Sequence, residues 1–180
     1  MRNYFLLLAM FFLTPYANAS TLIQQKIPQA QIVASARYSV FLFDVYDATF
    51  YTVNGKPKVT PPFALKLSYL RSIEGEDIAD RSAEEMRNQQ GVDEVTLADW
   101  HSQMRNIFPN VIKGDSITGI YQDNTQCEFY KNNTYIGHVA DSQFCNVFFD
   151  IWFGKNTSAP KLRNKLLGQQ NVSYLGDEKQ

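Results

Sequence analysis

Arg37 is the charged residue with the most unusual surroundings in this sequence. It precedes an apolar stretch that contains Phe41 and Phe43. Burying a guanidinium is costly unless an anion pairs with it. That anion is either the acidic group of a ligand or an internal carboxylate such as Asp44 or Asp47, since the planar fork of arginine suits both. The residues alone therefore leave two interpretations of Arg37, a ligand-binding residue and a member of a structural ion pair.

The familiar catalytic and metal-binding patterns do not occur in the sequence. It has no G-x-S-x-G, no H-E-x-x-H, no glycine-rich phosphate loop and no dinucleotide-binding fingerprint. His101 and His138 are the two histidines, and neither has cysteine or acidic neighbours at the spacing of metal ligands. Because a zinc site needs three or four protein ligands, we expect no metal and no cofactor.

Cys127 and Cys145 are the two cysteines of the chain. They lie too far apart for a C-x-x-C redox motif. In an oxidising compartment, an even number of cysteines without metal-type spacing favours a disulfide. Two buried free thiols are the alternative, since cysteine is among the most buried residue types.

The first residues predict the compartment. Arg2 is followed by an apolar run over residues 5–13 and an A-x-A triplet at residues 17–19, which is the order of a secretory signal peptide. The apolar run is much shorter than the ~20 residues that span a bilayer. We therefore predict a cleaved signal peptide over residues 1–19 and an exported, periplasmic protein of residues 20–180 with no membrane span.

The charge balance excludes one class of partner. The chain has 17 basic and 18 acidic residues, for a net charge of −1. A nucleic-acid-binding protein would need a basic excess or a basic stripe, so we expect no nucleic-acid partner. The same balance gives no indication of binding to anionic membranes.

Hydrophobic periodicity predicts the elements that position these residues. Alternation over residues 63–71 predicts a strand, Gly75 ends it, and apolar residues then recur at helical spacing over residues 76–89. A polar, glutamine-rich entry segment over residues 21–32 can add an edge strand. A strand is then predicted up to residue 35, followed by one long apolar strand over residues 37–53. Further strands are predicted over residues 115–123, 126–131 and 134–139, and further helices over residues 96–108, 142–153 and 158–167.

The order of these elements predicts a single α+β domain. Its antiparallel sheet has one face covered by helices. The helix over residues 142–153 is apolar nearly all round, so it should be buried in the middle of the domain. The chain after Gly168 is predicted to be a loosely ordered tail.

Three segments resemble the chalcone isomerase-like family. Residues 36–51, ARYSVFLFDVYDATFY, are similar to the family's early arginine and aromatic-rich strand. Residues 62–91 are similar to its strand-to-helix junction, and residues 148–168 to its closing pair of helices. The resemblance runs in order from about residue 31 to residue 168 and is strongest to the bacterial, exported branch. It implies an open-faced β-sandwich with a helical layer, in agreement with the periodicity.

The resemblance also implies which residues meet a ligand. In the family, an arginine at the start of the early strand holds a carboxylate or phenolate oxygen of the ligand, and Arg37 occupies the matching position. Tyr46 corresponds to a hydroxyl-bearing residue of that strand, and Arg81 to a lysine of the following helix. The resemblance thus implies a ligand-binding set of Arg37, Tyr46 and Arg81.

Other positions depart from the enzymes of the family. Ile78, Glu85 and Ile151 stand where those enzymes have a tyrosine, an asparagine and a threonine. An isoleucine cannot hold a water or polarise a ketone, so we do not expect chalcone isomerase chemistry or a catalytic residue. Because non-enzymatic members of the family hold fatty acids, we interpret the chain as a binder of a small amphipathic acid such as a fatty acid. The alternatives are an isomerase or lyase acting on an enone or phenolic substrate, and a protein-interaction module.

Overall fold

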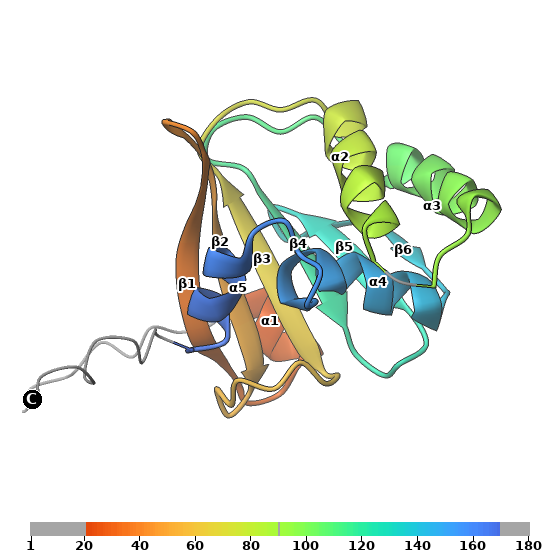
Figure 1. Ribbon diagram of the computed structural model, residues 1–180. Coiled ribbons are helices and arrows are strands. Elements are labelled where there is room, and N and C mark those ends of the chain that lie inside the picture. Colours follow the sequence, from red (N-terminus) through yellow and green to blue (C-terminus); the bar gives the residue numbers. More distant parts are fainter. Residues whose placement is uncertain (1–20, 90, 170–180) are drawn as a thin grey trace, which may run out of the picture.

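A six-stranded antiparallel sheet organises the chain. The computed structural model describes residues 21–89 and 91–169. The strands pair in the order β1-β2-β3-β4-β5-β6, so each strand lies beside its neighbours in the sequence (Figure 1). The strands are β1 (Ala30–Val40), β2 (Phe43–Val53), β3 (Phe63–Tyr69), β4 (Ser116–Tyr121), β5 (Cys127–Lys131) and β6 (Thr134–Val139).

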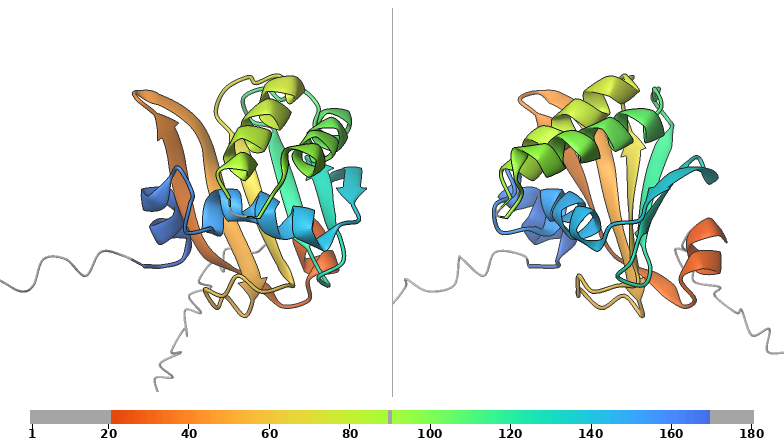
Figure 2. Two further views of the ribbon diagram at one scale, coloured as in Figure 1. Left: turned by 45° about the vertical axis from the view of Figure 1, so that its right-hand side comes forward. Right: turned by 90° about the vertical axis from the view of Figure 1, so that its right-hand side faces the viewer.

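Helices cover both faces of the sheet unequally. The helices are α1 (Thr21–Lys26), α2 (Gly75–Arg87), α3 (Glu94–Ile107), α4 (Ser142–Phe153) and α5 (Pro160–Leu166). Figure 2 shows α2, α3, α4 and α5 on one face and α1 alone on the other. This arrangement confirms the predicted α+β fold with an antiparallel sheet under a helical layer. No helix in the described part of the chain is long and apolar enough to cross a membrane.

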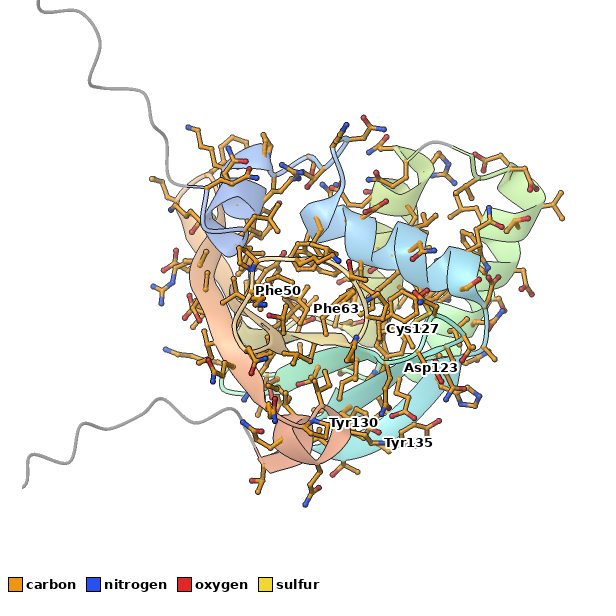
Figure 3. The ribbon with its side chains drawn as sticks, turned by 90° about the horizontal axis from the view of Figure 1, so that it is seen from below. Phe50, Phe63, Asp123, Cys127, Tyr130 and Tyr135 are labelled. Carbon is orange, nitrogen blue, oxygen red and sulfur yellow. A yellow bond between two sulfur atoms is a disulfide. The ribbon has the colours of Figure 1, made fainter. Side chains whose placement is uncertain are left out.

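The main core lies between the sheet and the four helices. Side chains of β3 alternate as predicted, with Phe63, Leu65 and Leu67 in this core. Eight residues of α4 are buried, which confirms the central position predicted for it. Figure 3 shows Phe50 and Phe63 between the sheet and the helices.

A smaller core lies under α1. The sequence predicts a polar entry segment or edge strand over residues 21–32, but residues 21–26 form α1, and Ile23 and Ile27 are fully buried on the outer face of the sheet. The two isoleucines are four residues apart, so one helical turn brings them onto the same side. Tyr130, which Figure 3 shows on the side of α1, packs in the same cluster.

The prediction of one long strand over residues 37–53 is wrong. The chain reverses at Phe41 and Leu42, so this stretch forms the end of β1 and the whole of β2. Phe41 has a φ of 53°, in the left-handed region that favours glycine or asparagine. The sequence has neither residue at the turn, and its apolar character runs on through it, so no local signal marked the reversal.

The predicted disulfide is present. Cys127 and Cys145 are bonded, with their Cα atoms 5.8 Å apart, and they join β5 to α4. The bond therefore ties the sheet to the helix at the centre of the main core. The predicted signal peptide, residues 1–19, and residues 170–180 of the predicted tail lie outside the described residues.

Candidate ligand-binding site

The main core contains a cavity of about 470 Å³ between the sheet and the helices, and the cavity is partly open to solvent. Its floor comes from β3, β4 and β5, through Leu65, Leu67 and Phe129 among others. Its roof comes from α2 and α4, through Ile78 and Ile151 among others. Most of the wall is therefore aliphatic or aromatic, which suits an apolar ligand.

The junction between β3 and α2 fixes the first turn of the helix beside the cavity. A Cβ on Gly75 would lie 2.1 Å from the backbone oxygen of Phe108, so only glycine allows this close approach. The Gly75 backbone N–H donates to Asn110 Oδ1 at 2.8 Å. From this start, Ile78, Arg81 and Glu85 follow at helical spacing and all line the cavity.

Arg81 and Glu85 form a charged cluster with Ser158 in the wall of the cavity. The Glu85 side chain is almost fully buried, whereas that of Arg81 is largely exposed at the rim. Glu85 Oε1 accepts a hydrogen bond from Arg81 Nη2 and another from Ser158 Oγ at 2.6 Å. Glu85 Oε2 is buried and has no hydrogen-bond partner in the described part of the chain.

Three tyrosines line the cavity next to this cluster. The rings of Tyr38 and Tyr46 stack with their centroids 5.1 Å apart, and Tyr69 meets Tyr46 edge-on at 6.1 Å. Burial raises the pKa of Tyr46 and of Tyr69 well above the ordinary value, so both phenols stay neutral. The Tyr46 hydroxyl accepts a hydrogen bond from Trp152 Nε1 at 3.0 Å, which leaves its own hydrogen for another acceptor.

Arg37 does not line the cavity, unlike Tyr46 and Arg81. Its Nε and Nη2 donate to the two carboxylate oxygens of Asp47 at 2.8 and 3.0 Å, and its Nη1 donates to Asp44 at 2.9 Å. These carboxylates raise the pKa of Arg37, chiefly through the hydrogen bonds that Asp47 accepts from it. The structure therefore shows the alternative arrangement, an exposed structural ion pair.

The alternation of side chains along β1 explains the position of Arg37. Ala36 is buried in the main core and Tyr38 lines the cavity, so Arg37 between them points to the opposite face of the sheet. Arg37 pairs with Asp47 in the β1–β2 register, which places the two side chains opposite each other. The apolar residues next to Arg37 in the sequence therefore do not surround its side chain, because they point to the other face of the sheet.

Several cavity residues were not predicted from the sequence. Tyr38 lies next to Tyr46 because the two residues are opposite each other in the β1–β2 hairpin. Trp152 and Ser158 reach the site from α4 and the segment after it. The aromatic alternation around the turn could have indicated Tyr38, but no local pattern marks Ser158 as a partner of Glu85.

The two histidines lie away from the cavity wall. His101 Nε2 is 2.6 Å from Asp80 Oδ1, and His138 Nδ1 is 2.7 Å from the Tyr135 hydroxyl. Among the described residues, no three histidine, cysteine, aspartate or glutamate side chains gather as metal ligands would. The polar groups on the cavity wall are instead Asp77, Arg81, Glu85, two serines and three tyrosines.

Comparison with known proteins places this architecture in a family. The sequence profile of chalcone isomerase-like proteins matches residues 33–168. The fold is similar to the crystal structure of a fatty-acid binding protein from Arabidopsis thaliana, with a TM-score of 0.60, 11% identity, and coverage of 86% of this chain and 90% of that chain. A sequence search of curated proteins gives no significant match. Since the profile spans well over half of the sequence, the protein belongs to the chalcone isomerase-like family.

Proposed function

We propose that the protein binds a small amphipathic acid with an aliphatic chain, such as a fatty acid, without converting it. The observation that carries this proposal is the cavity of about 470 Å³, with apolar walls and one charged cluster. Small-molecule sites typically have volumes of about 300–1,000 Å³ and a few well-placed polar groups. Each methylene that leaves water for such a wall contributes about 0.8 kcal/mol, so an aliphatic chain provides most of the affinity.

Two further observations support binding without catalysis. The protein shares its fold with a fatty-acid binding protein. Ile78 and Ile151, which line the cavity, put aliphatic groups where the resemblance places the hydroxyl groups of the enzymes. A site that lacks these groups has little to stabilise charge on a reacting oxygen.

We also propose that the protein works outside the cytoplasm. The signal-peptide pattern over residues 1–19 supports export of one domain of residues 20–180. The bond between Cys127 and Cys145 agrees with an oxidising compartment such as the periplasm. A carrier there would keep an apolar acid in solution.

The direct test is to identify what the protein carries. Protein purified from the periplasm of its own host is extracted with organic solvent, and the extract is analysed by mass spectrometry. The variant Ile78→Trp fills part of the cavity from α2, so its extract should contain far less lipid than that of the wild type. Val95→Trp adds bulk at an exposed position of α3 and is the matched control.

The outcomes separate clearly. A stoichiometric long-chain acid in the wild type and in Val95→Trp, but not in Ile78→Trp, supports the proposal. If the wild type carries no lipid and also fails to bind added dodecanoic acid in a calorimetric titration, the proposed function is wrong.

A further inference from the structure

The buried carboxylate of Glu85 limits which head groups the cavity can accept. Glu85 is 5% exposed and lines the cavity. Its Oε1 already accepts hydrogen bonds from Arg81 and Ser158, whereas its Oε2 is buried without a partner in the described residues. A buried charged oxygen without a donor is unfavourable, so a ligand that donates to it gains affinity over one that does not.

The charges around Glu85 do not favour a second carboxylate. Arg81 is the only basic residue among the described residues of the cavity wall, and it is paired with Glu85 and, at 3.1 Å, with Glu84. The other titratable groups on the wall are Asp77 of α2, Tyr38 of β1, Tyr46 of β2 and Tyr69 of β3. An ionised acid entering this site would therefore meet Glu85 without an unpaired cation, and two carboxylates in one site resist ionising together.

We infer that the ligand head group brings a hydrogen to Glu85 Oε2, so that an acid is bound with one proton shared between its carboxyl group and Glu85. This inference rests on the proposed function. Carboxylic acids have a pKa of about 4 in water, so at neutral pH the acid enters as an anion and the complex takes up one proton from solution. The pair then carries one negative charge, which Arg81 balances. An alcohol satisfies Glu85 with its own hydroxyl and needs no added proton.

The wild-type protein tests this directly with three ligands of equal chain length. Because one proton is taken up, the affinity for dodecanoic acid should fall about tenfold per pH unit between pH 6 and pH 8. The affinity for 1-dodecanol should stay constant over that range. Methyl dodecanoate, which has no hydrogen to donate, should bind about tenfold or more weakly than the alcohol.

The variant Glu85→Gln should remove the preference for ligands that donate a hydrogen. The amide oxygen can keep the hydrogen bonds from Arg81 and Ser158, while the NH₂ group puts a donor in place of Oε2. The pH dependence for dodecanoic acid should disappear, and methyl dodecanoate should bind about as tightly as 1-dodecanol, because the oxygen of either ligand can accept from the amide. Glu84→Gln is the control, since Glu84 pairs with the same Arg81 but does not line the cavity.

The results distinguish this inference from the proposed function. Acid binding that does not change with pH, together with equal affinities for alcohol and ester, overturns the inference and leaves the carrier function standing. No binding of any of the three ligands overturns the proposed function itself. If Glu85→Gln does not fold, the three wild-type titrations still decide the question.

A second inference comes from an independent feature, the tip of the β1–β2 hairpin. Phe41 and Leu42 are each 95% exposed, and Phe43 is 65% exposed. Phe41 also has a φ of 53°, a conformation that a bulky residue rarely adopts. Neither packing nor backbone preference accounts for an aromatic residue there, which points to a role outside the folded domain.

We propose that this tip inserts into the surface of a lipid bilayer. Figure 1 shows the tip at the upper left, apart from the helices, so the tip can insert into a bilayer without contact between the helices and the lipid. Arg37 and Asp44, exposed just behind it, would remain at the level of the head groups. Val40 both flanks the tip and lines the cavity, so an inserted tip would bring the cavity wall next to the lipid. With a net charge of −1, attachment would depend on apolar contact.

Flotation with phosphatidylcholine vesicles tests the second inference. The wild type should float with the vesicles at both low and high salt, and the double variant Phe41→Ser, Leu42→Ser should lose at least about tenfold in bound fraction. Val95→Ser, which removes an exposed apolar side chain on α3, should float like the wild type. Equal flotation of the wild type and the double variant would contradict the inference, as would no flotation at all. Self-association that depends on the tip, without flotation, would assign it to a second copy of the chain instead.

Discussion

The indole N–H of Trp152 donates a hydrogen bond to the Tyr46 hydroxyl, with 3.0 Å between the two heavy atoms. The bond links α4 to β2 across residues 106 positions apart in the sequence, beside the cavity. It holds the ring of Tyr46 between those of Tyr38 and Tyr69. The side chain of Tyr46 thus connects the sheet to the helical layer and also lines the ligand site.

Tyr46→Phe should destabilise the protein by about 1 kcal/mol. The change leaves the indole N–H of Trp152 without its acceptor in a part-buried position. The free energy of unfolding in urea measures the effect. Tyr38→Phe removes the hydroxyl from the stacked neighbour and should have a smaller effect, so equal losses in the two variants would contradict the role assigned to the bond.

Removing the disulfide should destabilise the protein by about 3 kcal/mol. The bond closes a loop with a sequence separation of 18, and closing such a loop restricts the unfolded chain. The double variant Cys127→Ala, Cys145→Ala should show this loss in urea unfolding relative to the oxidised wild type. Thiol titration of the denatured, unreduced wild type should find no free thiol, and two free thiols would show that the bond does not form in the cell.

Arg37→Met and Arg81→Met should separate the two arginines. Arg37 is an exposed partner of Asp44 and Asp47 outside the cavity, so its loss should change the affinity for dodecanoic acid by less than about twofold. Arg81 lines the cavity and pairs with Glu85, so its loss should weaken binding about tenfold or more. Calorimetric titration of both variants gives the comparison. If only Arg37→Met loses much of its affinity for dodecanoic acid, Arg37 binds the ligand and the assignment of Arg81 is wrong.

Asp115 should make stability depend on pH in the acid range. Hydrogen bonds from Asn132 and the Ile112 backbone, with Lys131 nearby, lower the pKa of Asp115 to about 2. An unfolded aspartate has a pKa of about 3.9, so the ionised group stabilises the fold above that pH and the contribution is lost as the pH falls from about 4 to about 2. Asp115→Asn should therefore be less stable than the wild type at pH 7, and the difference should shrink below pH 4. A difference that is constant from pH 7 to pH 2 would contradict this.

The protein should not cyclise chalcones above the uncatalysed rate. Ile78 and Ile151 line the cavity without a hydroxyl group, and the loss of one preorganised donor typically costs about 10²–10³ in rate. Chiral chromatography of the product from a chalcone substrate measures turnover. An excess of one flavanone enantiomer would show that the site is catalytic and that the binding interpretation is incomplete.

The sequence by itself determined the elements whose side chains repeat regularly. Alternation predicted β3, the glycine break at Gly75 predicted where α2 begins, and the apolar helix around Phe148 predicted the centre of the core. These patterns are reliable because each residue's face follows from its own strand or helix period. The two cysteines, taken with the predicted export, favoured the disulfide that the structure contains, since two cysteines allow one pairing.

Only the tertiary structure decided which polar groups share the cavity. The reversal at Phe41 places Arg37 on the outer face of the sheet and Tyr38 on the inner face. The turn contains no glycine, asparagine or proline from which it could be predicted. Ser158, in the segment after α4, meets Glu85 of α2 across 73 positions of the sequence, because α4 packs against α2. A one-residue change of register moves a side chain to the other face of a sheet, so the site depends on long-range pairing that local periodicity does not encode.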